Sequence, residues 1–252
     1  MQGWIRASAC LLFSIAVTLA QSAFGQQPDL DPNALAVLKQ TANSITGAKN
    51  FSFKVLISRD RIATDNQIVT YFNLDTVTVA RPDKLRIDVD GEHHNVQFFF
   101  NGKEATLFDA EQKFYTTHAG ADTIEGMLQN LEKRGVSFPM SDLLNSNPYD
   151  SFIHGLKTAY VVGRVDIEGK TFVHLVFTEG TADWQLWVSP GDKPLPRAMT
   201  IIYKTLPGSP RISMDFRDWD LNAQPASDLF DFTKPSDAHP IEFLAPHEGR
   251  QQ

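Results

Sequence analysis

The sequence predicts an α+β fold, in which a curved antiparallel sheet forms an incomplete, half-open β-barrel. An N-terminal helix and short helices plug its concave side. Three observations lead to this prediction. Apolar and polar residues alternate with a period of two over most of the chain, which is typical of half-buried strands. Tight turn sequences separate the alternating runs, so neighbouring strands are antiparallel. Helical periodicity is confined to the start and the middle of the chain, which favours helices segregated to one face.

The first 25 residues have the pattern of a secretory signal peptide. Arg6 supplies a positive start, an apolar run extends from Ala7 to Ala20, and small residues stand at Ala23 and Gly25, where a signal peptidase cleaves. The run of about 14 residues is shorter than the ~20 that span a bilayer as a helix. We therefore expect no integral membrane span in the mature chain, and secretion to the periplasm of a Gram-negative bacterium.

Cysteine content and charge exclude several classes of protein. The only cysteine, Cys10, lies inside the signal peptide. The mature chain then has no disulfide, iron–sulfur ligand, cysteine nucleophile or thiolate zinc site. The whole chain carries 23 basic and 30 acidic residues, a formal net charge of −7. This acidic balance argues against nucleic acid as a partner.

The mature chain is expected to form one domain, residues 32–246, between a disordered lead at 26–31 and a disordered tail at 247–252. Asp31 and Pro32 predict the start of the first helix as N-cap and first helical residue. Gly47 ends this helix. Its apolar residues recur at helical spacing: Leu35, Leu38, Ala42 and Ile45.

From Phe51 onward the period changes to two, and strands are expected at 51–58, around 77–79 and at 85–89. Asn101-Gly102 then joins two aromatic runs in a β-hairpin, because this dipeptide favours the turn that matches the twist of paired strands. Alternation sends Phe98 and Phe100 to one face. It sends Phe99 to the other, where an edge or a neighbouring loop would cover it.

Short helices interrupt the strands in the middle of the chain. Asp122 and Glu125 have the spacing of a capping box, followed by an apolar stripe to Leu131. Two further short helices are expected at 138–144 and 150–156. The later strands are expected at about 159–168, 171–178, 183–189, 197–205 and 210–221. The proline-rich stretch from Pro225 to Pro246 is expected to wrap the surface.

Several motifs resemble those of a known group of envelope proteins. Residues 80–87 (ARPDKLRI) lead to residues 100–109 (FNGKEATLFD), a run similar to one in the periplasmic LolA/LolB lipoprotein carriers. Residues 187–189 (WVS), 195–197 (LPR), 216–219 (FRDW) and 230–232 (FDF) resemble the second half of that fold. The similarity extends from about Asp31 to Pro235. It points to a family of uncharacterised predicted periplasmic proteins within the LolA/LolB-like superfamily.

The resemblance implies an incomplete barrel whose apolar cavity accepts acyl chains, with helices at its mouth. The acceptor member of the carriers depends on lipid attachment, and this chain departs from it because Cys10 does not have the residue pattern of an acylation site. The functional arginine of the carriers has no residue-by-residue match here, and Arg59 and Arg61 are its candidates.

Alternation and helical spacing together predict which residues line such a cavity. A sheet too wide to be filled by its own side chains leaves room for a ligand. The expected wall consists of Phe53, Val55, Ile57, Leu85, Ile87, Val89, Val96, Phe98, Phe100, Leu107, Trp184, Leu186, Ile201, Met214 and Phe216. The expected helical lid consists of Ile124, Met127, Leu131, Leu143, Phe152 and Leu156.

The sequence favours neither a metal site nor catalysis. Residues 88–94 (DVDGEHH) cluster carboxylates and imidazoles, but they follow the wet face of a strand and a turn and match no calcium loop. No Gly-x-Ser-x-Gly elbow occurs, and phosphate-binding glycine loops are absent. We therefore expect no enzyme, no metal and no cofactor.

The sequence is compatible with two functions. The first is a non-catalytic binding protein that holds an acyl chain or another apolar ligand, with a lipid or a lipoprotein as partner. The alternative is an envelope interaction or sensor domain with a packed core, no ligand and another envelope protein as partner. A carrier needs a continuous cavity on the concave face, whereas a sensor needs an exposed apolar patch elsewhere.

Overall fold

The structure is a computed structural model in which residues 29–92 and 94–242 are described. The expected signal peptide (1–25) and the expected tail (247–252) lie outside the described residues. Among the helices of the described part, none has both the length and the apolar character needed to cross a bilayer.

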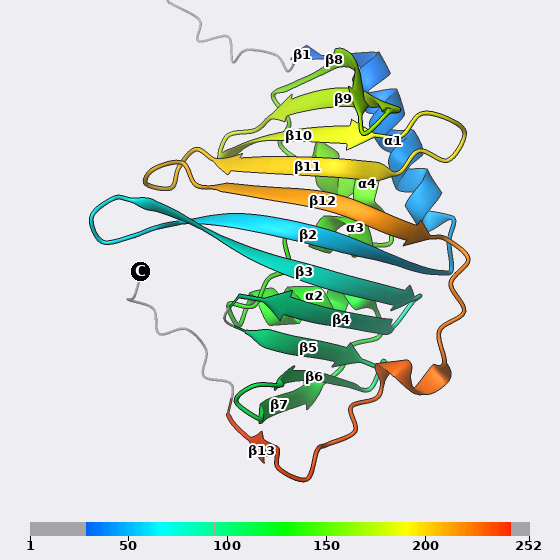
Figure 1. Ribbon diagram of the computed structural model, residues 1–252. Coiled ribbons are helices and arrows are strands. Elements are labelled where there is room, and N and C mark those ends of the chain that lie inside the picture. Colours follow the sequence, from blue (N-terminus) through cyan, green and yellow to red (C-terminus); the bar gives the residue numbers. More distant parts are fainter. Residues whose placement is uncertain (1–28, 93, 243–252) are drawn as a thin grey trace, which may run out of the picture.

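The described chain forms one large, curved sheet with helices behind one of its faces (Figure 1). The helices are α1 (Pro32–Thr46), α2 (Ile124–Glu132), α3 (Ser141–Leu144), α4 (Pro148–Ile153) and the 3₁₀ turn η1 (Ser227–Phe230). The strands are β1 (Asp29–Leu30), β2 (Asn50–Ile62), β3 (Ile68–Ala80), β4 (Lys84–Gly91), β5 (Asn95–Phe100), β6 (Glu104–Asp109), β7 (Phe114–Ala119), β8 (Thr158–Ile167), β9 (Lys170–Thr178), β10 (Ala182–Val188), β11 (Pro196–Tyr203), β12 (Arg211–Asp220) and β13 (His239–Pro240).

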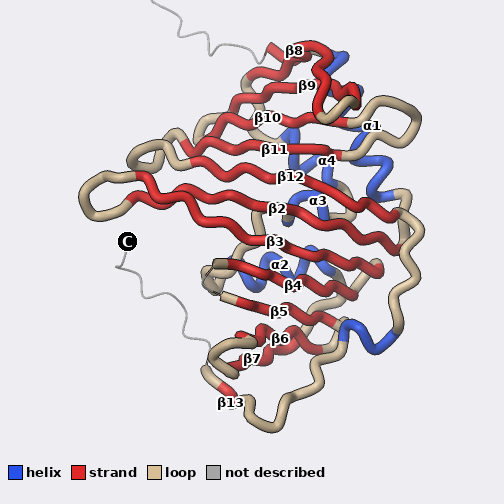
Figure 2. Tube along the Cα trace, in the orientation of Figure 1, coloured by secondary structure: helices blue, strands red, loops and turns tan. Residues whose placement is uncertain are grey.

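The strand order is β1-β8-β9-β10-β11-β12-β2-β3-β4-β5-β6-β7-β13. Two antiparallel meanders, β2–β7 and β8–β12, are therefore joined by the pairing of β12 with β2, in which Met214 lies opposite Ile57. The sheet ends at β1 and β13 and does not close. The helices α1 to α4 lie behind the strands in Figure 2, which confirms the expected α+β fold with an open, curved sheet.

Both outer strands are parallel to their neighbours and were not predicted. β1 pairs with the start of β8, and β13 pairs with β7. A strand of two residues has no periodicity to recognise. Residues 29–31 of the expected disordered lead therefore have structure, since Asp29–Leu30 is paired and the Asp31 side chain accepts a hydrogen bond from the N–H of Asn33 at 2.8 Å.

Two local details differ from the sequence prediction. The second aromatic run of the expected Asn101-Gly102 hairpin is divided into β6 and β7, because Asp109 accepts hydrogen bonds from the N–H groups of Glu111 and Gln112 in a turn. The N-cap of α2 is Thr123, whose hydroxyl accepts from the N–H of Gly126, and Asp122 is not the cap. Glu125 does not complete a capping box, because it accepts from the N–H of Ser146.

The main core lies between the helices and the inward face of the sheet. It takes side chains from both meanders and all four α-helices. In β2, Phe53 stacks on Trp219 with ring centroids 4.4 Å apart and also contacts Phe216 of β12. The aromatic contacts therefore reinforce the pairing of the two meanders.

The outward-facing Phe99 is covered by the C-terminal segment of the described chain. It packs with Phe108 against Phe232 and Ala238 of the C-terminal segment, and the Arg86 guanidinium lies 3.6 Å from the centre of its ring. This confirms the expectation that a neighbouring segment covers Phe99 and that the residues after Pro225 wrap the surface.

Replacing Phe53 by Ala should lower the free energy of unfolding by about 3–5 kcal/mol, the range for removing a buried phenylalanine. Phe53 is 1% exposed and lies at the seam between the meanders. Urea denaturation followed by circular dichroism measures the loss. Phe114→Ala is the matched control, because Phe114 is 40% exposed. Equal losses in the two variants would contradict the described core.

Candidate functional site

The helices fill most of the inward face of the sheet. All the predicted lid residues lie in the same buried core as most of the predicted wall. The wall residues that are buried there are Phe53, Val55, Ile57, Leu85, Ile87, Phe98, Phe100, Trp184, Leu186, Met214 and Phe216. Val89, Leu107 and Ile201 are partly buried against it, and the lid residues packed on it are Ile124, Met127, Leu131, Leu143, Phe152 and Leu156. In this structure the wall and the lid meet as a packed core, and their contact with a ligand stays a prediction.

A pocket of about 660 Å³ remains where the helical layer ends, a volume typical of small-molecule sites. It lies between the projecting end of the β2–β3 hairpin, the β4–β5 turn and residues 137–139. Its apolar lining includes Ile57, Ile62, Val69, Val89, Val96 and Phe138, and its polar lining includes Arg59, Arg61, Asn73, Asp75, Glu92 and His94. Three of the predicted wall residues thus line the pocket: Ile57, Val89 and Val96.

The segment from α2 to α3 forms the roof of this pocket and is held in place at both ends. The N–H of Ile124 donates to the carbonyl of Pro82 at 2.9 Å, and Arg81 donates to the carbonyl of Leu144, also at 2.9 Å. Phe138, in the connection between the two helices, contacts Phe98 with ring centroids 5.6 Å apart. These two hydrogen bonds and one aromatic contact therefore fix residues 137–139 over the sheet.

The floor of the pocket continues a row of inward-facing residues of β2. Alternation places Arg59 and Arg61 on the same face as Val55 and Ile57, which lie under the helices. From the sequence, these arginines were candidates only through the family resemblance, although alternation itself places them on the inward face. Asp75 and Asn73 of the neighbouring strand β3 were missed because the predicted strand began only at Val77.

Asp75 is the most buried charged group of the pocket, with 2% of the residue exposed. Its carboxylate accepts a hydrogen bond from the side-chain amide of Asn73. Burial raises its pKa to about 6, although that hydrogen bond and the charge of Arg59 both favour the carboxylate.

Arg59 is also partly desolvated. Burial lowers the pKa of its guanidinium, and the neighbouring charge of Arg61 lowers it further. Its Nε is buried and has no hydrogen-bond partner. The pocket thus combines apolar walls with two adjacent cationic groups.

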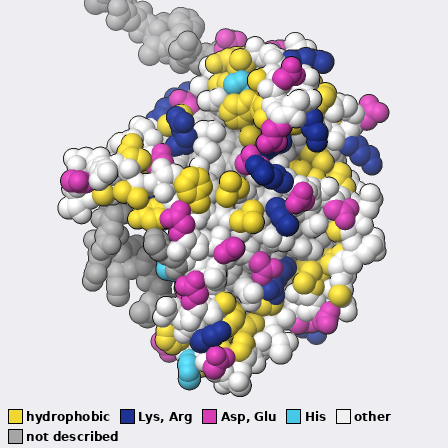
Figure 3. All heavy atoms as spheres, in the orientation of Figure 1, with side chains coloured by type: hydrophobic (Ala, Val, Ile, Leu, Met, Phe, Trp, Pro, Cys, Tyr) yellow, Lys and Arg dark blue, Asp and Glu magenta, His cyan; other side chains and the backbone are white. Residues whose placement is uncertain are grey.

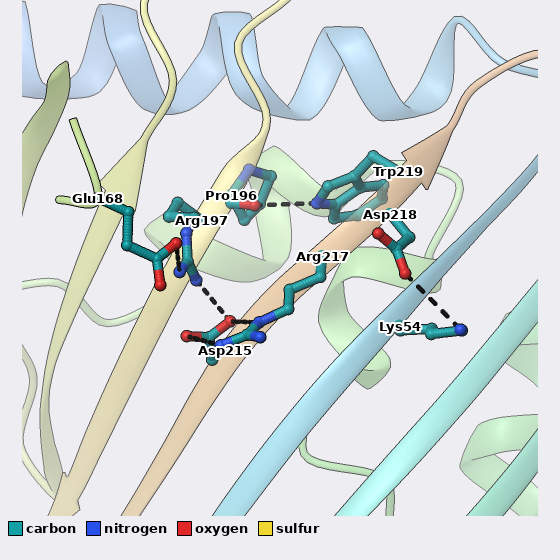
Figure 4. A network of polar contacts seen from close by, with 8 residues as sticks. All are labelled: Lys54, Glu168, Pro196, Arg197, Asp215, Arg217, Asp218 and Trp219. Atoms are coloured by element: carbon teal, nitrogen blue, oxygen red, sulfur yellow. Dashed lines mark hydrogen bonds and ion pairs between the residues drawn. The ribbon is translucent and has the colours of Figure 1, made fainter. Parts of the chain in front are cut away.

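A second polar cluster lies on the opposite face of the sheet (Figure 4). Arg197 pairs with Asp215 at 2.5 Å and with Glu168 at 3.2 Å, and Arg217 pairs with the same aspartate at 2.8 Å. Each charge drawn in Figure 4 has a partner of opposite charge, since Lys54 and Asp218 also form an ion pair at 3.7 Å. We assign this cluster to stability.

The acidic run at 88–94 is divided between separate contacts. Asp88 pairs with Arg86 at 2.6 Å, and Glu92 accepts from the N–H of Phe72 at 2.9 Å. Within residues 29–92 and 94–242, no three histidine, aspartate or glutamate side chains gather closely enough to hold a metal ion.

The model of one protein family, described as predicted periplasmic protein (DUF2092), matches residues 34–244. No curated protein sequence matches the chain. Several solved structures are similar. An uncharacterised conserved protein from Thermus thermophilus is 12% identical, with a TM-score of 0.48 over 83% of this chain and 98% of that one.

Two further solved structures are from other bacteria. The LolA superfamily protein from Nitrosomonas europaea is 14% identical, with a TM-score of 0.39 over 79% of this chain and 97% of that one. The lipoprotein LppX from Mycobacterium tuberculosis is 16% identical, with a TM-score of 0.42 over 77% of this chain and 98% of that one.

Asp75→Asn should make the protein more stable at pH 7, by up to about 3 kcal/mol. The pKa of Asp75 in the folded protein, about 6, exceeds the ordinary value of 3.8. Between these values the folded state binds more protons than the unfolded state, so the free energy of unfolding falls as the pH rises. The variant should lose this dependence and have no advantage at pH 4. Urea denaturation of the wild type and the variant at pH 7 and pH 4 tests this difference. Asp90→Asn, at an exposed position, is the control.

Asp215→Asn should have the opposite pH dependence. Burial favours a higher pKa for Asp215, but the hydrogen bonds from Arg217 and Arg197 outweigh it and hold the pKa below its usual value. The carboxylate therefore stabilises the fold at neutral pH, and this contribution is lost as the pH falls through the folded-state pKa. We expect a loss of about 1 kcal/mol at pH 7, measured by urea denaturation. Asp218→Asn, which removes an exposed ion pair with Lys54 at 3.7 Å, should change little.

Proposed function

This chain belongs to the DUF2092 family of predicted periplasmic proteins, and we propose that it is a non-catalytic binding protein of the periplasm. It holds an acyl chain or another apolar ligand in the pocket between the β2–β3 hairpin, the β4–β5 turn and residues 137–139. The observation that carries the proposal is the volume of about 660 Å³ left open at the end of an otherwise filled inward face.

The lining of the pocket supports an apolar ligand. Val89 and Val96 lie opposite each other on β4 and β5, and Ile57 and Val69 extend the same apolar surface across β2 and β3. A ligand gains about 0.8 kcal/mol for each methylene group that it buries there. Several methylene groups in the pocket therefore give useful affinity without any covalent bond.

The polar groups of the pocket favour binding over catalysis. Asp75 is engaged by Asn73, and Glu92 is engaged by the main chain of β3. A hydrolytic site needs a nucleophile held beside a general base, and neither of these carboxylates makes such a bond to a hydroxyl group. The pocket therefore supplies shape and charge for recognition.

The packed helices act as the lid in this proposal. Residues 137–139 separate the pocket from the part of the core that contains Phe98 and Phe100. Displacement of this segment opens a path from Val96 towards Phe98 and Phe100, and a longer chain then replaces Phe138 in contact with Phe98. The deeper predicted residues thus become ligand contacts only when the lid moves.

One observation favours the alternative of an interaction domain. The projecting β2–β3 hairpin carries exposed apolar side chains on its outer surface: Leu56, Ile68, Phe72 and Leu74 are each more than a third exposed. Figure 3 shows apolar side chains gathered on this projection, among scattered charges. Such a patch suits contact with another protein of the envelope.

Val96→Trp should abolish ligand binding, because the indole ring fills the pocket from its floor. The measurement is native mass spectrometry, with lipid extraction, of mature protein purified from a bacterial envelope without detergent. We expect the wild type to carry an acyl species in stoichiometric amount and the variant to carry none. Val162→Trp, at an exposed position of β8, is the matched control and should retain the ligand.

Circular dichroism of each variant separates loss of ligand from loss of fold. A wild-type protein that shows only its own mass, and takes up no fluorescent fatty acid, would refute the binding function and favour the interaction domain.

A further inference from the structure

We propose that the ligand of this pocket carries an anionic group, which Arg59 and Arg61 bind together at the polar end of the pocket. This inference rests on the proposed function and names its substrate class: an anionic amphiphile, such as an alkyl carboxylate or an alkyl phosphate. The reasons lie in the position of the two arginines, in their lack of partners and in the charges around them.

The two arginines stand at the end of an apolar surface. Arg59 lies opposite Tyr71 and Arg61 opposite Val69 in the β2–β3 ladder. Both follow Ile57 on the inward face of β2, and all three residues line the pocket. An apolar chain seated on Ile57 and Val96 therefore places its head group beside the two guanidinium groups.

Neither arginine is paired within the described part of the chain, and the charge of Asp75 favours the charged form of Arg59 only from beyond ion-pair distance. No hydrogen bond or ion pair joins the guanidinium of Arg59 or of Arg61 to any described residue, and the buried Nε of Arg59 is without a partner. Arg86, Arg197 and Arg217, by contrast, each pair with an aspartate. The chain has 30 acidic residues, so a shortage of carboxylates does not explain why these two arginines have no ion pair.

Arg81 also has buried nitrogen atoms without hydrogen-bond partners, but its surroundings differ from those of Arg59. Arg81 donates one hydrogen bond to the carbonyl of Leu144, and its guanidinium lies 5.5 Å from the centre of the Phe51 ring. It lies outside the pocket lining and holds the helices on the sheet. Among the described arginines, Arg59 and Arg61 alone combine missing partners with a place in the pocket.

The two carboxylates of the pocket do not fill this role. Asp75 is bonded to Asn73, and Glu92 to the N–H of Phe72. Neither lies within ion-pair distance of Arg59 or Arg61. Two like charges on alternate residues of one strand repel each other, and an anion bound between them converts this repulsion into attraction. Without an anion, the unpaired charge of the partly buried Arg59 lowers the stability of the folded protein, whereas Arg61 is exposed to solvent.

Matched probes with the same ten-carbon chain test the proposal. Isothermal titration compares decanoate and decyl phosphate, which are anionic, with neutral decanol and cationic decylamine. We expect both anions to bind the wild type at least about tenfold more tightly than decanol, the effect of one charge-assisted hydrogen bond. Inorganic phosphate and acetate, offered alone, should bind far more weakly than the amphiphiles.

Arginine variants then assign the preference to residues. Arg59→Gln and Arg61→Gln should each weaken decanoate binding by about tenfold and leave the affinity for decanol unchanged. Arg164→Gln, at an exposed position of β8, is the matched control and should leave both affinities unchanged. The melting temperature of the unliganded Arg59→Gln protein should rise by roughly 2–4 °C, because an unpaired charge is removed from a partly buried site.

The outcomes separate this inference from the proposed function. Equal affinities for decanoate and decanol, with no effect of Arg59→Gln, would overturn the anionic head group and leave the apolar pocket in place. Phosphate binding as tightly as decyl phosphate would overturn the amphiphile, since the free anion would then suffice. A lower melting temperature for Arg59→Gln would make Arg59 a structural residue. Failure of every probe on a folded wild type would overturn the proposed function itself.

Discussion

The antiparallel pairing of β12 with β2 is the interaction on which the rest of the architecture depends. It joins two meanders that are separate in the sequence, and the rings of Phe53, Phe216 and Trp219 pack across the same seam. Without it there is no continuous inward face for α1 to α4 to cover. The hairpin that carries the pocket begins at this seam, so the same pairing positions the candidate site.

The side chains on the inward face of β2 change from apolar to charged along the strand. Under the helices it is aromatic and aliphatic, and beyond them it carries Arg59 and Arg61. One strand thereby contributes both to the core and to the lining of the pocket, and the boundary lies where the helical layer stops. Core residues and pocket residues are thus separated along one regular strand.

Much of the fold followed from periodicity and turn chemistry, and the family resemblance is confirmed by the match over residues 34–244. The candidate site was harder to predict. Alternation identifies the face of a residue such as Phe98, but it does not reveal whether Phe138 packs against it or a void remains. The polar end of β3, with Asn73 and Asp75, lacks the apolar alternation that reveals a strand. The two-residue edge strands depend on partners more than a hundred positions away.

Both outer edges of the sheet are held by segments close to the ends of the described chain. Asp29 pairs with Thr158, and His239 pairs with Phe114, so each edge is completed by residues remote in sequence. The central pairing of β2 with β12 likewise forms only after β12 has emerged. A chain that emerges N-terminus first, from the ribosome or from a membrane channel, therefore cannot complete this sheet until His239 has emerged. Such high contact order makes folding slow and leaves exposed strand edges in the meantime. Completion of the sheet is thus a late event, which follows the emergence of both meanders.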